Sequence, residues 1–259
     1  MSAEARQQRI ADAPDLDAAL AAIDGVEGWL SEDQARRLWN AALDVKGPGQ
    51  IVEIGSFRGR STIVLSRAAA EGVQVVAIDP HGGGDRGPQE ITPDAERGNE
   101  DNRVFRANLE GAGVNGRVRH VRLMSDEAHS GVDGSIDMLY VDGAHRYAPA
   151  RDDIAAWGAR VPVGGTLLVH DAYNAIGVML AQLRLLFFAG RWRYVGRSRS
   201  LAQYRREDLS AGARVANALR QAVHIPYFVR NLVIKVALVA RLRPVARLLG
   251  QPEEDAWPY

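Results

Sequence analysis

Short apolar runs alternate with longer amphipathic stretches along most of this chain, and the alternation predicts its main elements. The runs are rich in Val, Ile and Leu, whereas the stretches between them carry apolar residues at helical spacing. Several runs are continuously apolar, as in strands that are covered on both faces. Buried strands separated by helices predict an α/β fold with a doubly wound, mostly parallel sheet. The five runs lie at 50–55, 73–79, 118–124, 136–142 and 165–171.

Both ends of the chain depart from this alternation. Residues 15–45 have the apolar spacing of one or two helices, and Ser31 stands three residues before Gln34, as in a capping box. After a predicted helix at about 176–189, the segments RWRYVG and SLAQYR predict a terminal hairpin. The hairpin would add two antiparallel strands, so we expect a seven-stranded sheet.

These patterns divide the chain into an N-terminal helical cap (1–46), an α/β domain (47–208) and a basic C-terminal helical extension (209–259). Between residues 191 and 249, thirteen Arg or Lys residues stand against two acids, although the net charge of the whole chain is zero. Such a split indicates that the basic segment contacts an anionic surface or the acidic part of a partner subunit. The alternative is a solvated arginine-rich face.

The extension also contains an apolar stretch, residues 232–242, in which nine of eleven residues are apolar. It is too short to span a bilayer and includes Lys235 and Arg241. Its basic residues do not share one helical face, as an interfacial helix would require. We expect a packed or subunit-bridging helix in a homodimer first, and peripheral membrane contact second.

The composition sets further limits. A chain of 259 residues that is 46% hydrophobic and 25% charged suits a soluble globular protein. The absence of cysteine excludes disulfides, cysteine–zinc sites and thiol catalysis. The first residues lack the apolar core of a signal peptide, and no 18 uncharged apolar residues follow one another, so no spanning helix is expected. We expect a cytoplasmic protein without a nucleic-acid partner.

The segment QIVEIGSFRGRST, residues 50–62, places an acid at a strand end before two glycines four residues apart. It lacks the middle glycine of the dinucleotide fingerprint and the Gly-Lys-Ser/Thr of a P-loop. An ordinary tight βα turn is one interpretation. The other is a resemblance of the E-x-G-x-x-x-G pattern to the first motif of the class I, seven-strand S-adenosylmethionine-dependent methyltransferases. This resemblance implies that Glu53 faces the cationic end of the cofactor, and that Gly55, Ser56, Gly59 and Ser61 form its loop.

Three later features agree with this resemblance. Asp79 ends the second predicted strand, twenty residues after Gly59, where a carboxylate can accept ribose hydroxyls. The segment MSDEA at 124–128 resembles the adenine-binding motif of the family, which implies Ser125 and Asp126 near the adenine edge. The terminal hairpin is typical of this Rossmann-like methyltransferase domain and not of a nicotinamide dehydrogenase, which is the rival enzyme class.

Acids and histidines gather at two neighbouring strand ends, LYVDGAHRY and LLVHDAY. Carboxylate oxygens there suit Mg²⁺ or another divalent cation. The strand ends resemble those of metal-dependent sugar O-methyltransferases. This implies that Asp142 and Asp171 bind the metal and that Asp142 and His145 are catalytic, with Asp142 also beside the cofactor. His170 stands where such enzymes often carry Glu, and it is a poor magnesium ligand, which leaves the third ligand open.

The remaining polar features are open to more than one interpretation. Asp152 and Asp153 are expected to begin a helix. The long loop 79–94 is typical of a lid, which makes His81 an alternative base beside His145 and His170. Arg58 could contact the cofactor carboxylate, whereas Arg60 is expected to be solvated.

The acceptor follows from resemblance alone. The chain is similar to small bacterial enzymes that methylate sugars, macrolide sugars and polymethylated polysaccharides, which implies a sugar, glycoside or oligosaccharide acceptor. A non-catalytic adenosine-binding or scaffold protein is the remaining alternative, against which the intact set of acids and histidines weighs.

Overall fold

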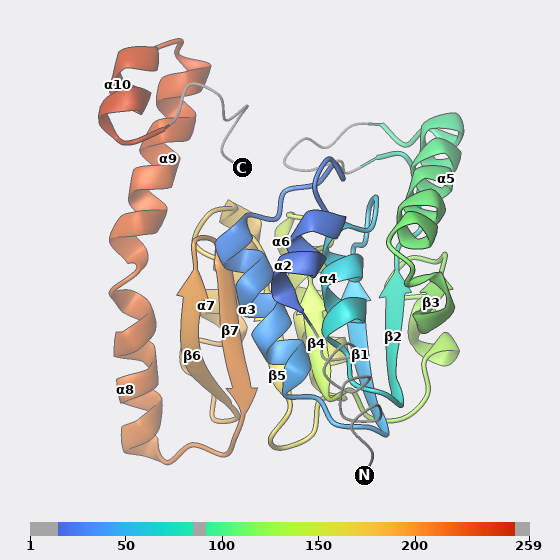
Figure 1. Cartoon of the computed structure of the whole chain (residues 1–259). Coiled ribbons are helices and arrows are strands. Elements are labelled where there is room, and N and C mark those ends of the chain that lie inside the picture. Colours follow the sequence, from blue (N-terminus) through green and yellow to red (C-terminus); the bar gives the residue numbers. More distant parts are fainter. Residues whose placement is uncertain (1–14, 85–91, 252–259) are drawn as a thin grey trace.

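A seven-stranded sheet organises residues 15–84 and 92–251, the part of the chain that this computed structural model describes (Figure 1). Its strand order is β3-β2-β1-β4-β5-β7-β6. Strands β1 to β5 pair in parallel, and β7 runs antiparallel to both β5 and β6. The predicted mostly parallel sheet with a terminal hairpin is confirmed. The strands are β1 (Gly49–Ile54), β2 (Val73–Ile78), β3 (Val118–Val121), β4 (Met138–Val141), β5 (Thr166–Val169), β6 (Trp192–Ser198) and β7 (Leu201–Arg206).

Helices cover both faces of the sheet because successive strand residues point to opposite sides. Val52 and Ile54 of β1 pack with one layer, whereas Ile51 packs with the other. The first layer contains α6 (Tyr147–Gly158) and α7 (Ile176–Leu185), and the second contains α2 (Leu16–Ala22), α3 (Glu32–Leu43), α4 (Arg60–Ala68) and α5 (Ala95–Gly111). Two short 3₁₀ turns, η1 (Asn115–Arg117) and η2 (Ala128–Gly131), flank β3.

The N-terminal cap is part of the main core. Leu38 and Trp39 of α3 are buried in the same cluster as Ile51 of β1. The predicted capping box is present, since the Ser31 backbone N–H donates to Gln34 Oε1 at 2.9 Å. The cap and the sheet therefore share one core, and the division at residue 46 stays a prediction.

The C-terminal extension consists of α8 (Ala211–Ala222), α9 (Ile225–Val239) and α10 (Arg243–Leu248). α8 packs on the edge strand, where Asn217 accepts from Tyr194 N at 2.6 Å and donates to Trp192 O at 3.0 Å. Figure 1 shows α9 continuing beyond the end of the sheet, with α10 folded back against it.

The extension contains a longer apolar helical segment than the sequence pattern suggested. Residues Ala211–Val239 form a helical segment of 29 residues, which by length and composition could cross a membrane. The sequence pattern suggested a shorter apolar stretch because charges interrupt it. Only 17% of the most apolar window is buried inside the structure, so most of this surface faces outward.

Candidate active site

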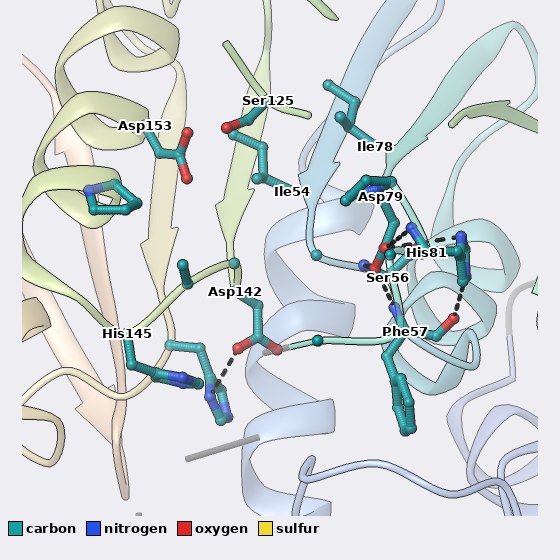
Figure 2. Close-up of a pocket in the computed structure, with 18 of the residues that line it drawn as sticks. Ile54, Ser56, Phe57, Ile78, Asp79, His81, Ser125, Asp142, His145 and Asp153 are labelled. Atoms are coloured by element: carbon teal, nitrogen blue, oxygen red, sulfur yellow. Dashed lines mark hydrogen bonds and ion pairs between the residues drawn. The ribbon is translucent and has the colours of Figure 1, made fainter. Parts of the chain in front are cut away.

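A cavity of about 360 Å³ opens where β1, β2, β4 and β5 end (Figure 2). The carboxyl ends of parallel strands are the usual ligand site of an open α/β sheet. Gly55, Asp79, Asp142 and His170 follow these four strands and all line the cavity. The sheet thus gathers the glycine loop and the acidic strand ends around one space, as the sequence predicted.

Gly55 allows the loop after β1 to pass directly under the strand end that carries Asp142. Its φ is +84°, and a Cβ atom there would lie 2.2 Å from the Asp142 carbonyl oxygen. Both the left-handed backbone and the close approach require glycine. Gly59, with φ of +89°, is the N-cap of α4 and packs against Phe105 instead of lining the cavity.

Asp79 holds the glycine loop in place. Its Oδ2 accepts backbone N–H bonds from Ser56 at 3.0 Å and Phe57 at 2.8 Å, and its Oδ1 accepts from His81 N at 2.7 Å. Figure 2 shows the carboxylate at the end of β2 between these groups. The two oxygens keep further lone pairs toward the cavity, so a position beside ribose hydroxyls fits the structure.

Glu53 lies elsewhere than the resemblance implies. It is fully buried on the α4 side of β1 and does not line the cavity. Thr62 donates to its Oε2 at 2.5 Å, and Ser61, which does line the cavity, donates to Oε1. Burial raises the pKa of Glu53 to about 8. This enclosed carboxyl, whose neutral form burial favours, holds Ser61 and Thr62 at the start of α4.

The adenine-side residues separate into two groups. Ser125 lines the cavity, whereas Asp126 is exposed and does not. Asp153 faces Ser125 across this end of the cavity (Figure 2). Burial raises the pKa of Asp153 to about 6. The expectation that Asp153 begins a helix is wrong, because α6 already begins at Tyr147 and places Asp153 in its second turn.

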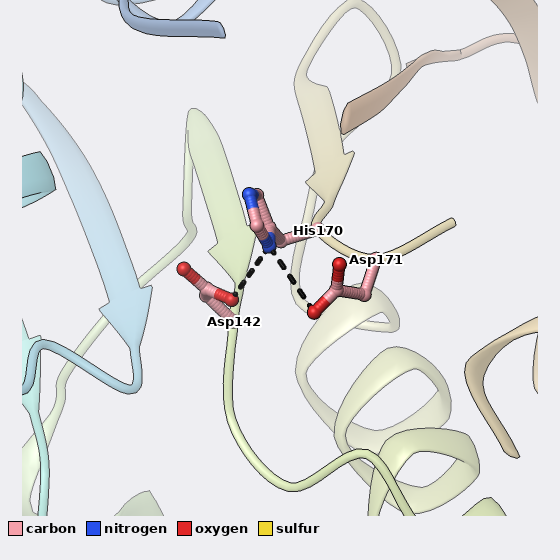
Figure 3. Close-up of side chains that lie close together, drawn as sticks. All are labelled: Asp142, His170 and Asp171. Atoms are coloured by element: carbon pink, nitrogen blue, oxygen red, sulfur yellow. Dashed lines mark ion pairs between the residues drawn. The ribbon is translucent and has the colours of Figure 1, made fainter. Parts of the chain in front are cut away.

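The predicted catalytic residues meet at the ends of β4 and β5. His145 Nε2 lies 2.5 Å from Asp171 Oδ2, and His170 Nδ1 lies 3.1 Å from Asp142 Oδ1 and 3.5 Å from Asp171 Oδ2 (Figure 3). Tyr140 donates to the other Asp142 oxygen at 2.6 Å. Burial lowers the pKa of His145, but the hydrogen bond to Asp171 and the charges of Asp171 and Asp142 together outweigh burial and raise this pKa above its ordinary value.

Asp171 stays ionised. Burial favours its neutral form, but the neighbouring imidazoles of His170 and His145 outweigh burial and hold its pKa well below the ordinary value. Its backbone is left-handed, with φ of +53°. The result is a buried carboxylate that binds an imidazole at the edge of the cavity.

A divalent cation fits part of this cluster. Ligand atoms of Asp142, His170 and Asp171 all lie within 4.8 Å of one another. The two carboxylates suit a hard cation, but an imidazole nitrogen is a poor ligand for Mg²⁺ and suits Mn²⁺, Fe²⁺ or Zn²⁺ better. The site therefore supports a cation held mainly by carboxylate oxygens.

The C-terminal extension braces the loop after β5. Asn174 donates to Asp171 Oδ1 at 3.1 Å, and Lys235 of α9 donates to the Asn174 carbonyl at 2.7 Å. Asn231, one turn earlier in α9, donates to Tyr173 O at 3.3 Å. Burial lowers the pKa of Lys235 to about 8. No local pattern in the sequence signals this support, because 61 residues separate Asn174 from Lys235.

Aromatic side chains form the outer wall of the cavity. Trp29 of the cap stacks on Phe57 of the glycine loop, with ring centroids 5.4 Å apart, and both line the cavity. Arg60 fixes the cap loop by donating to the carbonyls of Ile23, Val26 and Leu30 at 2.6–3.1 Å. The expectation of a solvated Arg60 is therefore wrong.

The structure also places two further residues that the sequence offered, Arg58 and His81. Arg58 pairs with Asp101 at 3.0 Å and with Glu27, so its guanidinium is engaged in the protein. The His81 side chain is 1% exposed, and its Nε2 lies 2.8 Å from Phe57 O. His170 is similarly enclosed at 3% exposed, whereas His145 is 21% exposed, so His145 is the most accessible of the three candidate bases. Residues 85–91 of the predicted lid lie outside the described residues.

Comparison with known proteins finds the same fold in several methyltransferases. Residues 52–172 match the family described as "Methyltransferase domain". The cofactor-bound protein Rv0187 from MTB is 21% identical over 74% of this chain and 89% of that chain, with a TM-score of 0.51. A methyltransferase from Podospora anserina bound to SAH is 15% identical over 74% and 88%, with a TM-score of 0.56. An O-methyltransferase from Bacillus cereus in complex with SAH is 16% identical over 74% and 90%, with a TM-score of 0.50.

The chain therefore has the fold of these solved methyltransferases, and residues 52–172 are similar to the methyltransferase domain family. The terminal hairpin predicted from the sequence is part of this fold. The rival interpretation as a nicotinamide oxidoreductase is set aside, since β7 lies antiparallel between β5 and β6.

Proposed function

We propose that this enzyme transfers a methyl group from S-adenosylmethionine to a hydroxyl oxygen. The observation that carries the proposal is the contact of 2.5 Å between His145 Nε2 and Asp171 Oδ2 at the edge of the cofactor cavity. A histidine oriented by a buried carboxylate is the usual arrangement of a general base. His145 remains 21% exposed, whereas Asp171 is 2% exposed, so the histidine is the member of the pair that a substrate can reach.

The proposed reaction balances with this chain's own residues. The acceptor oxygen attacks the methyl carbon while the bond from that carbon to the sulfonium sulfur breaks. The acceptor proton passes to His145, whose raised pKa favours the protonated product state. Asp171 stabilises the imidazolium that results. The products are a methyl ether and S-adenosylhomocysteine.

A divalent cation is the second part of the proposal. Asp142 and Asp171 would hold it through their oxygens. Contacts with Tyr140 and His170 fix the position of the Asp142 carboxylate. A cation bound there would lower the pKa of the acceptor hydroxyl. Mg²⁺ and Mn²⁺ are the candidates that suit carboxylate oxygens.

The acceptor is proposed to be a sugar or glycoside. Figure 2 shows Phe57 on one side of the cavity and Asp142 and His145 on the other. Trp29 stacks on Phe57 and extends this aromatic wall. A sugar ring presents an apolar face and a hydroxyl-bearing edge, which match these two sides. Action on an oligosaccharide of a polymethylated polysaccharide stays a prediction.

The proposal is tested by mixing the protein with S-adenosylmethionine and a panel of glycosides and phenols, and measuring S-adenosylhomocysteine by mass spectrometry. We expect turnover with glycosides that His145→Ala abolishes. His129→Ala is the matched control, because His129 stacks on Trp157 at 4.2 Å outside the cavity. Turnover restricted to phenols would refute the sugar acceptor, and equal loss in both variants would refute the role of His145.

We further propose that the extension docks on an anionic membrane surface. Residues 209–250 contain seven Arg or Lys residues and no acid. Eleven large apolar side chains of the same segment are exposed, including Val229 and Val233 of α9. A second copy would bring two cationic surfaces together, whereas anionic lipid complements both the charge and the apolar face. The homodimer stays a prediction.

A further inference from the structure

A second groove lies between α3 and the β6–β7 hairpin. Its volume is about 530 Å³, and the described residues that line it differ from those that line the cavity at the strand ends. Gln34 of α3 contacts both regions, since its Nε2 lies 3.1 Å from His170 Nε2, at the cavity, and 3.1 Å from Ser200 Oγ, in the hairpin turn. The charged residues that line the groove are Asp33, Arg36, Arg37, Arg197 and Arg199.

The charges in this groove do not balance. Two of its four arginines have acidic neighbours, because Arg36 pairs with Glu32 at 2.7 Å and Arg199 lies 3.9 Å from Asp33. Within the described part of the chain, no carboxylate pairs with the other two arginines, whose hydrogen bonds go to uncharged groups. The groove therefore keeps two cationic side chains without a counter-ion from the protein.

Arg37 is the first of these two cations, and it reaches from α3 onto the hairpin. Its Nε donates to Ser198 Oγ at 2.9 Å, and its Nη1 donates to Gln203 Oε1 at 2.8 Å. A guanidinium has five N–H donors, so several remain beyond these two bonds. Burial lowers the pKa of Arg37. A bound anion would stabilise a cation that is partly withdrawn from water and held only by neutral groups.

Arg197 of β6 is the second cation, and the start of α9 fixes its orientation. Its guanidinium carbon lies 4.0 Å from the centroid of the Tyr227 ring, and its Nη1 donates to the Arg199 carbonyl at 2.6 Å. Its Nε is buried and has no hydrogen-bond partner among the described residues. Stacking on an aromatic ring restricts a guanidinium before any ligand arrives, which lowers the entropy cost of binding.

We propose that this groove binds a phosphate group through Arg37 and Arg197. Guanidinium donors match the spacing of phosphate oxygens, and a tetrahedral oxyanion can accept from two arginines that come from different elements. Arg199 at the groove is 62% exposed, so a ligand can enter from solvent. The open groove suits a terminal phosphate, carried by a soluble molecule or by the headgroup of phosphatidic acid. This site requires neither methyl transfer nor docking through α9.

The site is tested by titrating inorganic phosphate into the full chain at low salt and following the arginine Nε–H signals by NMR. We expect the two signals that Arg37→Gln and Arg197→Gln remove to shift together with one dissociation constant. Each variant should weaken phosphate binding about tenfold or more, because a charge-assisted hydrogen bond is lost. Arg205→Gln is the matched control, since it removes the same charge from an exposed position of β7 outside the groove.

A variant with the opposite effect separates charge from folding. Asp33 is an acid that lines the groove, and its side chain is 69% exposed. Asp33→Asn removes its repulsion of an anion and should tighten phosphate binding about threefold, the scale of one exposed charge interaction. A protein that merely loses structure cannot bind phosphate more tightly. Unchanged or weaker binding by Asp33→Asn would count against the groove.

Two results would overturn the proposal. One is a wild-type protein in which phosphate leaves the Arg37 and Arg197 signals unshifted. The other is a loss of affinity in Arg205→Gln as large as in Arg37→Gln, which would show that phosphate follows the overall charge.

Vesicles of phosphatidylcholine with and without phosphatidic acid distinguish the two sources of the phosphate. Sedimentation that depends on phosphatidic acid and is lost in Arg37→Gln would identify the lipid headgroup. Sedimentation that Arg37→Gln leaves unchanged, together with weakened binding of free phosphate, would identify a soluble ligand. Val233→Glu leaves the groove intact, so failure of docking through α9 and failure of the groove give different results.

Discussion

Replacing Glu53 with glutamine should remove a large pH dependence of stability. Glu53 is fully buried, and its pKa is raised from 4.5 to about 8. Between these values the folded state holds a proton that the unfolded chain has lost. The contribution of Glu53 to stability is therefore full below pH 4.5 and declines as the pH rises toward 8. The amide of the Glu53→Gln variant stays neutral throughout and keeps contacts to Ser61 and Thr62.

The size of the effect follows from the shift. Each pH unit inside this window corresponds to about 1.4 kcal/mol. From pH 5.5 to 7.5, the free energy of unfolding of the wild type should fall by about 2 to 3 kcal/mol relative to Glu53→Gln. Urea unfolding followed by the fluorescence of the five tryptophans measures both proteins under the same conditions. Subtracting the free energy of unfolding of the variant from that of the wild type cancels the contribution of all other titrating groups.

Two outcomes would refute this reasoning. Parallel stability curves would mean that Glu53 titrates alike in the folded and unfolded chains, and a wild type that gains stability with pH would mean a lowered pKa. The same variant tests the cofactor role, because a neutral, enclosed Glu53 predicts S-adenosylmethionine affinity within about threefold of wild type. A loss of tenfold or more, about 1.4 kcal/mol, would return Glu53 to the cofactor site.

Four further predictions concern the site and the extension. Asp79→Ala should weaken S-adenosylmethionine binding by about 1–3 kcal/mol by calorimetry, since three backbone N–H groups and the ribose lose an acceptor; unchanged affinity would remove Asp79 from the site. His145→Ala should lower kcat by roughly 10²–10⁴-fold with cofactor affinity near wild type, and a smaller loss would shift the base to another group. EDTA should abolish turnover and Mg²⁺ or Mn²⁺ restore it, with Asp142→Ala inactive yet cofactor-binding; full activity in chelator would refute the cation. Val233→Glu should reduce sedimentation with phosphatidylserine vesicles, whereas Val163→Glu, at an exposed valine outside the extension, should not; equal binding of both would refute docking through α9.

The fold could be predicted from the sequence because its signals are local. Apolar runs separated by helical spacing define strands and helices, and the segment around Arg199 defines the hairpin. The start of α6 could not be located, because Arg146 provides no side-chain cap and the chain continues helical from Tyr147. Asp153 was therefore assigned to a helix terminus and its place in the cavity was missed.

The site was predictable only where strand topology decides it. Asp142 and Asp171 meet because β4 and β5 are neighbours in a parallel sheet. The direction of Glu53 also follows from strand alternation, since it has the parity of Ile51 and faces α4. The contact of Gln34 with His170 joins distant elements, and no local pattern signals it.

The bracing of the loop after β5 limits how this enzyme can be divided or recombined. The segment that matches the family ends at residue 172, immediately after Asp171. Asn174, Lys235 and Gln34, which orient Asp171 and His170, all lie beyond its limits. A chimera that received residues 52–172 alone would contain Asp142, His145 and Asp171 without the side chains that orient this cluster. Chimeras that exchange substrate preference between related proteins should therefore be active only when the cap and α9 are transferred together with residues 52–172.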